Sequence, residues 1–476
     1  MEREKGFIEY KRKVSPYRSI SERIKDYNDV NTYLSEDEIE KQASRCMDCG
    51  IPFCHSIGCP LSNLIPEWNK LVSNKQWKDA LMRLEKTNML PEITGRICPG
   101  LCETSCTLSV NHSPVTIRQI ELAIIEKGFK MNWVMPVVPK VKRGKKIAII
   151  GSGPAGLSAA QLLRVMGYEV TVFEKSLQAG GILRYGIPNF KLEKWVIDRR
   201  INLMKESQII FETDVKIGED ISYHYLNKRF DAILLTTGIG VSRDLPIPGR
   251  NAQGIYFSID YLNRSNQCLT GELQENKIVS AHNKNVIIIG GGDTGADCVG
   301  IANRQGAKKI LQLEIMPKPK SWNYEWNPNW PNWPVILRTC SSHEEGVQRK
   351  WSILTKEFIT KQNKVTGIRC VRLKWNRPEN GDSLHMIEIP NSEFNLQADI
   401  VLLALGFTPP KYSKLYQDIG IELDKKGNIK INQEHSTSVE GIFAAGDSCS
   451  GASLVVNAIL HGREAAKAID RFLENK

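Results

Sequence analysis

The 476-residue sequence is poor in long apolar runs. Its N-terminus, Met1-Glu-Arg-Glu-Lys, is charged where a secretory signal peptide needs an apolar stretch, so we expect a cytoplasmic protein. Only the segment 147–165 is apolar over the length of a membrane span, and its three regularly spaced glycines indicate a turn in a soluble fold instead. The sequence therefore predicts no membrane partner.

Charge of one sign is not concentrated in any segment. The 64 Lys and Arg residues exceed the 53 Asp and Glu residues, for a formal net charge of +11, but both kinds are mixed throughout the chain. This pattern predicts a solvated surface and no nucleic-acid partner, with a basic face toward an acidic partner subunit as the alternative.

A buried strand, a glycine turn and a helix follow one another from Lys146. The apolar run 147–150 is typical of a parallel strand, the run GSGPAG follows at 151–156, and helix formers continue to Gly167. A second strand ends at Glu174, about 20 residues further on, where a carboxylate accepts the ribose hydroxyls of a dinucleotide. This order predicts a dinucleotide site at Gly151, Gly153, Pro154, Ala155, Gly156 and Glu174.

The same unit recurs later in the chain. An apolar run at 286–289 leads into GGGDTG, a helix to about Gln305 and a strand at 310–315. Each unit is closed by a similar strand that ends in glycine, Gly238 in the first and Gly406 in the second. Two such folds predict two dinucleotides, or one ligand and one decayed copy, with the second site at Gly290, Gly292, Asp293, Thr294 and Gly295.

Seven of the 12 cysteines lie in the first 140 residues, in two groups. Cys46, Cys49, Cys54 and Cys59 form the first group, and Cys98, Cys102 and Cys106 form the second. Without secretion, thiols at this density predict a soft metal centre rather than disulfides. Zinc is one alternative, but seven thiolates exceed the needs of one tetrahedral ion, and Cys-Pro pairs are typical of ferredoxin-type ligand runs, which favours two 4Fe-4S clusters. The cysteines at 268, 298, 340, 370 and 449 show no ligand spacing and are expected in cores or as incidental residues.

Five motifs together closely resemble the small (beta) subunit of glutamate synthase. They are RCMDCGIPFC at 45–54, GRICPGLCE at 95–103, GSGPAG, GGGDTGAD and AAGDSCSGASLVV at 444–456. The same architecture occurs in the N-terminal part of dihydropyrimidine dehydrogenase and in electron-bifurcating flavoproteins. The C-terminal motif resembles that of two-dinucleotide flavoprotein reductases, in which the residue matching Asp447 contacts the flavin side chain.

The resemblance implies an α/β fold. A helical N-terminal iron-sulfur domain (1–140) is followed by two Rossmann-like dinucleotide-binding domains, with the NAD(P) domain (251–405) inserted in the FAD domain (141–250 and 406–476). It also implies that FAD binds the first unit and NAD(P)H the second. The flavin is expected to be contacted further by Gly181, Gly186, Pro188, Gly238, Gly446, Asp447 and Gly451.

One cluster ligand is expected to be a carboxylate, because two 4Fe-4S clusters need eight ligands and only seven cysteines are at hand. Glu121 falls inside an apolar stripe of helical spacing, where an unpaired carboxylate is costly, unless it reaches water or pairs with an Arg such as Arg96. In dihydropyrimidine dehydrogenase a glutamine on the matching helix completes a cluster. By this pattern one cluster takes Cys46, Cys49, Cys54 and Cys106, and the other takes Cys59, Cys98, Cys102 and Glu121.

The resemblance implies the function of an electron-input subunit, which oxidises NAD(P)H and passes the electrons through FAD and the clusters. The implied acceptor is the large (alpha) subunit of glutamate synthase, a separate chain that makes glutamate from glutamine and 2-oxoglutarate. Because the cofactors carry out the chemistry, this function does not require a catalytic Ser-His or His-Asp pair. The alternative is a stand-alone or bifurcating oxidoreductase with ferredoxin or polysulfide as acceptor; an iron-sulfur scaffold with inactive dinucleotide folds is disfavoured by two intact fingerprints.

Two further expectations concern the second unit. Glu314 ends its second strand, where a carboxylate binds a ribose diol and repels a 2′-phosphate, which favours NADH over NADPH. Lys318, Lys320 and Arg304 could offset that repulsion. The Trp-rich loop 322–334 is expected either to cover the nucleotide or to contact a partner.

Overall fold

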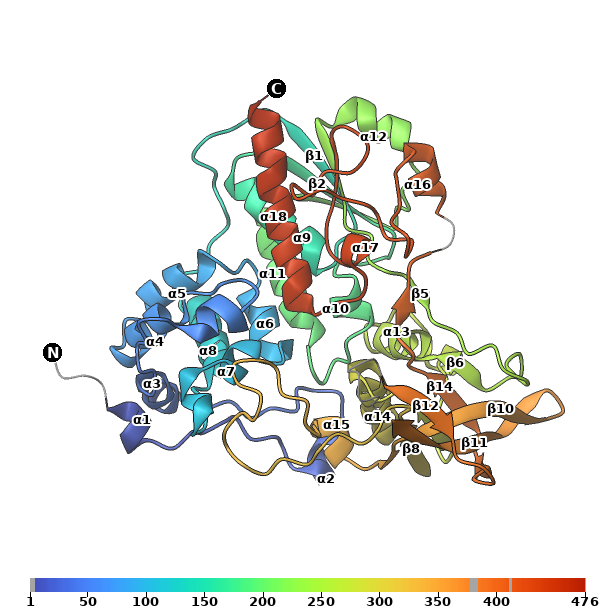
Figure 1. Ribbon diagram of the computed structural model, residues 1–476. Helices are drawn as coiled ribbons and strands as arrows, with labels where there is room; N and C mark the ends of the chain where they lie inside the picture. The colour runs from blue at the N-terminus through green and yellow to red at the C-terminus, as the bar shows by residue number, and fades with distance from the viewer. Residues whose placement is uncertain (1–4, 377–383, 411–412, 476) are drawn as a thin grey trace.

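The structure is a computed structural model that describes residues 5–376, 384–410 and 413–475. It contains a helical unit at the N-terminal side and two α/β units, and Figure 1 shows the three side by side, with the C-terminal helix running along the first α/β unit. No helix of the described residues combines the length and the hydropathy that a membrane span requires.

The helical unit is made of short helices, of which α3 is capped by the Ser35 side chain and two others carry a proline in the first turn. Pro66 and Pro91 lie in the first turns of α4 and α6, where a missing N–H costs nothing. The helices are α1 (Gly6–Glu9), α2 (Ile20–Arg23), α3 (Glu36–Ser44), the π-helix η1 (Cys54–Gly58), α4 (Ile65–Ser73), α5 (Trp77–Glu85), α6 (Pro91–Ile97), α7 (Leu101–Thr104), the 3-10 helix η2 (Thr107–Val110) and α8 (Ile117–Lys130).

Close packing of α6 on α8 sets the position of the second cysteine group. A Cβ added at Gly95 of α6 would lie 2.8 Å from the Cβ of Leu122 on α8, so the two helices approach to a distance that only glycine allows. The next residues after α6 include Cys98, and Glu121 precedes Leu122. The crossing therefore brings Glu121 toward the cysteines.

The first α/β unit has a five-stranded parallel sheet in the order β16-β4-β1-β2-β3. Its strands are β1 (Lys146–Ile150), β2 (Glu169–Glu174), β3 (Ile210–Thr213), β4 (Ala232–Leu235) and β16 (Ile442–Ala444). Its helices are α9 (Pro154–Val165), α10 (Ile182–Tyr185), α11 (Lys194–Glu206), α12 (Tyr223–Arg229), α16 (Lys414–Ile419), α17 (Asp447–Ser450) and α18 (Val455–Glu474). The buried faces of β1 and β4 are apolar along their length, as parallel strands covered on both sides require.

The second α/β unit has a parallel sheet in the order β6-β14-β7-β8-β9. Its strands are β6 (Ile255–Phe257), β7 (Asn285–Ile289), β8 (Lys309–Leu313), β9 (Gln348–Lys350) and β14 (Ile400–Leu403), and its helices are α13 (Ser258–Leu269), η3 (Glu275–Lys277), α14 (Asp293–Arg304) and α15 (Ser341–Glu344). Strand β16 belongs to the sheet of the first unit, but it follows all strands of the second sheet in the sequence. The predicted insertion of one Rossmann-like unit in the other is thereby confirmed.

Two features of this insertion were not predicted. The chain passes from the first α/β unit to the second and back again, and the two connecting segments pair as short antiparallel strands, β5 (Val241–Ser242) and β15 (Phe407–Thr408). A four-stranded antiparallel sheet extends the second unit, formed by β10 (Ile353–Lys361), β11 (Lys364–Asn376), β12 (His385–Glu388) and β13 (Phe394–Gln397). Apolar and polar residues alternate over much of β11, which is a sequence signal for a strand but not for its partner strands.

The helical unit and the first α/β unit share one hydrophobic core. The core runs from Trp68 and Ile125 in the helical unit to Leu163 and Ile469 in the first α/β unit. Helix α18 lies beside α9 (Figure 1), and a Cβ at Gly462 would lie 2.1 Å from the carbonyl oxygen of Ala155. These two units therefore pack on each other through a continuous core. The second sheet has its own core clusters, one of which also includes Val30 of the helical unit and Phe190 of the first α/β unit.

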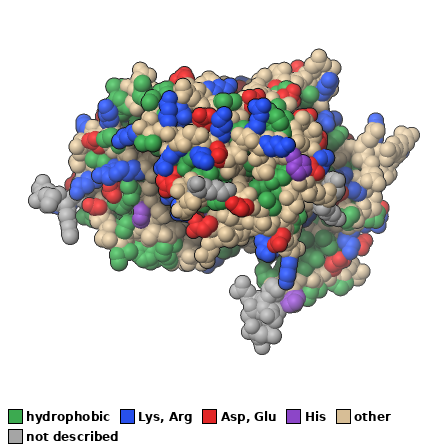
Figure 2. Space-filling model, turned by 90° about the horizontal axis from the view of Figure 1, so that it is seen from above, with side chains coloured by type: hydrophobic (Ala, Val, Ile, Leu, Met, Phe, Trp, Pro, Cys, Tyr) green, Lys and Arg blue, Asp and Glu red, His purple; other side chains and the backbone are tan. Residues whose placement is uncertain are grey.

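The surface seen in Figure 2 carries Lys and Arg side chains interspersed with Asp and Glu. On that face the excess of basic residues does not gather into a field of one sign, in agreement with the mixing of charges along the sequence.

Candidate functional site

The first glycine turn lies between β1 and α9. Gly151 has φ +108°, and a Cβ there would lie 2.3 Å from the carbonyl oxygen of Thr236, so the turn needs glycine. Glu174 is buried at the end of β2 and accepts hydrogen bonds from the backbone N–H of Ser152 at 3.1 Å and from that of Ser176 at 2.9 Å. The structure thus brings the predicted acid to the predicted turn, at the N-terminus of α9.

The second glycine turn repeats this geometry between β7 and α14. Glu314 accepts from the backbone N–H of Gly291 at 2.7 Å and from that of Met316 at 3.0 Å. The first unit places Glu174 on the corresponding N–H groups, so the two acids occupy equivalent places. The positions predicted from the second fingerprint, 290–295, surround the N-terminus of α14.

Two of the cations that could offset Glu314 lie over aromatic rings, and the third is buried in an ion pair. The Lys318 ammonium lies over the ring of Trp351 at 5.3 Å, and that of Lys320 over Trp322 at 5.4 Å. The suggestion that Arg304 could help is wrong, because its fully buried guanidinium is bound to Glu345.

The C-terminal motif closes the first site. Gly446 and Gly451 have φ +72° and +80° on either side of α17, and Asp447 accepts from the hydroxyl of Ser453 at 2.8 Å. Burial raises the pKa of Asp447, partly offset by this hydrogen bond. α18 begins four residues after Gly451, with its N-terminus directed to the space between the units.

A central cavity of about 340 Å³, partly open to solvent, lies where the three units meet. The first α/β unit contributes Gly186 and Val455, the second contributes Thr294, and the helical unit contributes Cys98. Residues predicted for the flavin, for the nicotinamide nucleotide and for a cluster therefore line one space. Gly181 and Pro188 are the sequence neighbours of the lining residues Ile182 and Ile187, and Gly181 lies close to Gly153. Gly238 follows β4 in a loop of the first unit and is not among the lining residues.

Sequence reasoning missed a partly buried ion pair that lines this cavity. Lys191, from the loop before α11, pairs with Asp297 on α14. Burial acts to lower the pKa of Lys191, but the Asp297 carboxylate outweighs it and the pKa is raised. The pair links the two α/β units across 106 residues of sequence, for which no local signal exists.

Arg338 was also missed. Its guanidinium lies 3.3 Å from the centroid of the Trp333 ring, and burial lowers its pKa to about 10, opposed by the nearby Asp293 carboxylate. The Arg338 cation therefore lies near Asp293, the first residue of α14, and dinucleotide phosphates bind at this helix N-terminus in this fold.

The ligands predicted for one of the two clusters surround a second, small cavity. Its lining includes the thiols of Cys46, Cys49, Cys54 and Cys106. Burial raises the pKa of Cys46 to about 11 and also raises that of Cys54 and of Cys106, where the neighbouring thiols add to the effect. Four thiols around one cavity, of which Cys54 and Cys106 are buried and Cys46 and Cys49 are partly exposed, are a donor set that fits a soft, positively charged group.

The ligands predicted for the other cluster are Cys59, Cys98, Cys102 and Glu121. Burial raises the pKa of Cys59 to about 12 and that of Cys98 to about 11, with Glu121 contributing in both cases. Glu121 is buried, accepts from the Thr94 hydroxyl and from Asn88 at 3.0 Å, and burial raises its pKa to about 7. The alternative of a pair with Arg96 is wrong, since Arg96 binds Glu126 at 2.9 Å.

The remaining cysteines are dispersed. All 12 cysteines are free thiols, and Cys298 and Cys370 lie in the two hydrophobic cores of the second α/β unit. In the described part of the chain, no three His, Cys, Asp or Glu side chains converge closely enough to hold a single metal ion.

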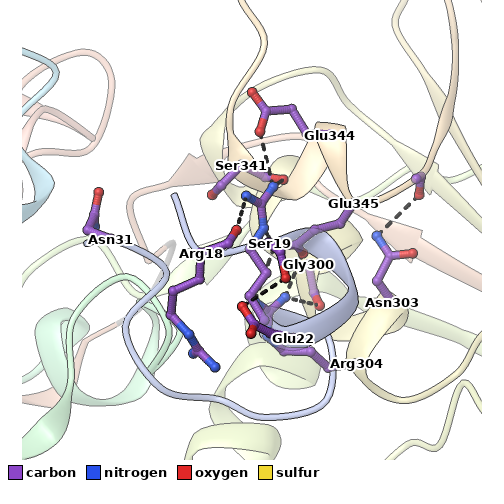
Figure 3. A network of polar contacts seen from close by, with 12 residues as sticks. Arg18, Ser19, Glu22, Asn31, Gly300, Asn303, Arg304, Ser341, Glu344 and Glu345 are labelled. Atoms are coloured by element: carbon purple, nitrogen blue, oxygen red, sulfur yellow. Dashed lines mark hydrogen bonds and ion pairs between the residues drawn. The ribbon is translucent and has the colours of Figure 1, made fainter. Parts of the chain in front are cut away.

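A buried polar network ties the leading segment of the helical unit to the second α/β unit (Figure 3). The Glu345 carboxylate accepts from Arg23 at 2.9 Å and from Arg304 at 2.6 Å, and Arg23 also bonds Glu344 at 3.0 Å and the Ser341 carbonyl at 2.9 Å. Glu345 and Arg304 have no exposed side-chain surface, and that of Arg23 is 2% exposed. The network fixes α14 and α15 against the segment that leads to the cysteines.

Two family models match the chain. Residues 145–462 match the model described as pyridine nucleotide-disulphide oxidoreductase, and residues 23–133 match that of dihydropyrimidine dehydrogenase domain II, 4Fe-4S cluster. The two matches follow the division between the helical unit and the α/β units.

Among similar proteins, the glutamate synthase (NADPH) small chain of Mycobacterium tuberculosis is 44% identical over 98% of this chain and 95% of that protein. The corresponding small chain of Bacillus subtilis is 41% identical over 98% of each. The glutamate synthase (NADH) of Schizosaccharomyces pombe is 44% identical over 99% of this chain but only 23% of its own length.

Among solved structures, Mycobacterium tuberculosis FprA in complex with NADPH aligns with a TM-score of 0.54 at 15% identity, over 70% of this chain and 85% of that one. At this identity the likeness shows the fold of the two α/β units.

Proposed function

The chain belongs to the glutamate synthase small-chain family, and from this premise we propose that it is the electron-input subunit of a glutamate synthase. It takes reducing equivalents from NAD(P)H and delivers them to a separate large subunit, which forms glutamate from glutamine and 2-oxoglutarate. The relatives that the chain matches over their whole length are named small chains, which supports a large partner. Free thiols at this density support a cytoplasmic location.

The central cavity is the observation that carries the proposal. Gly186 from the first α/β unit, Thr294 from the second and Cys98 from the helical unit line the same space. When bound, FAD accepts two electrons as hydride and can release them singly to iron-sulfur clusters. The chain's own residues supply binding, orientation and exclusion of water around that exchange.

The residues assigned to each ligand follow the division into three units proposed from the sequence, 1–140, 141–250 with 406–476, and 251–405. The Gly151 turn, Glu174 and Asp447 hold FAD. The Gly290 turn and Glu314 hold the nicotinamide nucleotide, and we add Arg338 as a contact for its phosphates.

The helical unit holds two 4Fe-4S clusters in this proposal. The small cavity supports the first ligand set, Cys46, Cys49, Cys54 and Cys106. The mutual influence of Cys59, Cys98, Cys102 and Glu121 on their pKa values supports the second. Because Cys98 also lines the central cavity, the second set is the one placed next to the flavin.

The test uses the full chain with and without the large subunit. The chain alone should contain FAD and iron and reduce an artificial acceptor with NAD(P)H without forming glutamate, and glutamate should form when the large subunit is added. Cys98→Ser should lower glutamate formation more than acceptor reduction, whereas Cys268→Ser, at a partly exposed thiol outside both groups, should lower neither. Glutamate formation by the chain alone, or transfer to ferredoxin or polysulfide without binding of a large subunit, would refute the proposal.

A further inference from the structure

The Trp-rich loop 322–334 belongs to the second α/β unit but packs on the helical unit. It leaves the second sheet after β8 and passes close to α7 before it returns to α15 (Figure 1). Asn327 donates from its backbone N–H to the Ser109 carbonyl at 2.7 Å and from its side chain to the Thr104 carbonyl at 2.8 Å, and the Ser105 hydroxyl donates to the Pro331 carbonyl at 2.6 Å. Neither expectation for this loop describes these contacts, which all fall on the segment that carries Cys102 and Cys106.

Trp330 makes the contact nearest to the thiols. Its indole N–H donates to the carbonyl oxygen of Cys106 at 3.1 Å. Its ring lies against that of Phe53, with centroids 4.8 Å apart and an angle of 44° between the planes. Phe53 immediately precedes Cys54. One side chain therefore touches the backbone of one predicted ligand and the neighbour of another.

The two ligands touched in this way belong to the same set. Cys54 and Cys106 both line the small cavity, although they are 52 residues apart in sequence. Cys54 begins the π-helix η1, and Cys106 lies in the short turn between α7 and the 3-10 helix η2, so both segments are irregular. Short irregular turns hold their geometry through contacts from outside, and here the contact comes from another unit of the protein.

We propose that Trp330 is a positioning residue for the group bound by Cys46, Cys49, Cys54 and Cys106. It holds the Cys54 and Cys106 turns in register and keeps water from them, so that a loop of the nucleotide-binding unit sets the properties of this cluster. The inference rests on the proposed function, because it requires a 4Fe-4S cluster at this cavity.

The direction of the effect follows from electrostatics. A cluster with four thiolate ligands becomes more negative when it is reduced, and an environment of low dielectric disfavours the more highly charged form. Removing the indole admits water, which stabilises the reduced form. The reduction potential of this cluster should therefore rise, and its reaction with oxygen should become faster.

The experiment compares the full chain with Trp330→Ala, Trp330→Phe and Trp326→Ala. Each protein is titrated with dithionite while the clusters are followed by electron paramagnetic resonance, and iron content and bleaching in air are measured. Trp330→Ala should raise the potential of one cluster only and bleach several-fold faster. Trp330→Phe keeps the ring and loses the donor, so it should retain its iron and bleach nearly as slowly as the wild type.

Trp326→Ala is the matched control, because the Trp326 ring packs on Trp322 at 4.6 Å and on Tyr324 at 5.7 Å within the same loop. It should leave both potentials unchanged. Phe53→Leu removes the same ring contact from the side of the helical unit, and it replaces Trp330→Ala as the test if Trp330→Ala folds poorly. It should give the same rise in potential and the same faster bleaching.

The outcomes separate the inference from the proposed function. Equal changes in both clusters, or none in either Trp330→Ala or Phe53→Leu, would overturn the role of Trp330 while leaving the iron-sulfur assignment intact. A wild-type chain without iron would instead overturn the proposed function, and this inference with it.

Discussion

Glu314 accepts a hydrogen bond from the backbone N–H of Gly291 at 2.7 Å, and this repeats the bond of 3.1 Å between Glu174 and Ser152 in the first α/β unit. In both units the acid lies beside the glycine turn at the place where the fingerprint binds an adenosine ribose. The repeated geometry argues that the second site, like the first, is built for a free ribose diol.

A change at Glu314 should therefore alter the choice of nucleotide. Glu314→Gln removes the negative charge that opposes a 2′-phosphate, so the ratio of kcat/KM for NADPH to that for NADH should rise by about tenfold, about 1.4 kcal/mol. Steady-state kinetics with an artificial acceptor measure this ratio. Glu174→Gln is the control, which should loosen FAD without changing the ratio. A wild-type enzyme that strongly prefers NADPH would contradict the role of Glu314.

Glu121 provides a second prediction. If it completes the cluster of Cys59, Cys98 and Cys102, Glu121→Ala should leave one cluster intact and make the other labile, because a buried ligand position is lost. Iron analysis and electron paramagnetic resonance of the purified variant would show about half of the iron lost. Glu126→Ala, on the same helix but paired with Arg96 and Arg199, is the control and should keep its iron. Unchanged iron and spectra in Glu121→Ala would remove Glu121 from the ligand set.

The third prediction concerns the buried polar network around Glu345. Glu345→Gln leaves Arg23 and Arg304 without their shared carboxylate in a fully buried place, and such a loss costs about 3–5 kcal/mol. The apparent melting temperature should fall, and limited proteolysis should become faster in the segment around Arg23. Asp418→Asn breaks the exposed pair with Lys414 and should cost about 1 kcal/mol or less. Equal stability of the two variants would show that the network does not hold the units together.

The sequence predicted the parts of the fold that have a strong local signal. The runs that became β1 and β7, their glycine turns and the helices α9 and α14 carry apolar periodicity and fixed glycine spacing, and each lies within a few residues of its expected place. The cysteine groups were equally visible. The position of these cysteines in space could not be predicted, because it depends on packing between distant segments, such as that of α6 on α8.

The parts that could not be predicted depend on pairing across long stretches of sequence. Lys191 meets Asp297, and Arg23 meets Glu345, 322 residues further on, with no local pattern to reveal either pair. The Trp-rich loop is irregular, and only the structure shows that it docks at Cys106. The antiparallel strands β10–β13 were missed although β11 alternates, because alternation alone does not identify the partner strands.

His343 gives a prediction on pH dependence. Its Nε2 bonds Gln312 at 3.0 Å, and its Nδ1 accepts from the backbone N–H of Cys340 at 3.3 Å, an arrangement that suits the neutral ring. Burial lowers the pKa of His343 to about 4, and the cations of Arg349 and Lys191 add to this effect. Since the unfolded chain titrates near about 6.5, the folded state binds fewer protons between these values. The contribution of His343 to stability is therefore fully present above about pH 6.5 and is lost as the pH falls toward 4.

After allowance for the partial exposure of the ring, this contribution amounts to about 1–2 kcal/mol between pH 7.5 and pH 5. His343→Gln keeps an acceptor and a donor but cannot gain a proton, so its melting temperature should fall less on acidification than that of the wild type. The exposed His385 is the matched control, and His385→Gln should follow the wild type. Parallel curves for wild type and His343→Gln from pH 7.5 to pH 5 would show that the ring is not held neutral in the folded protein.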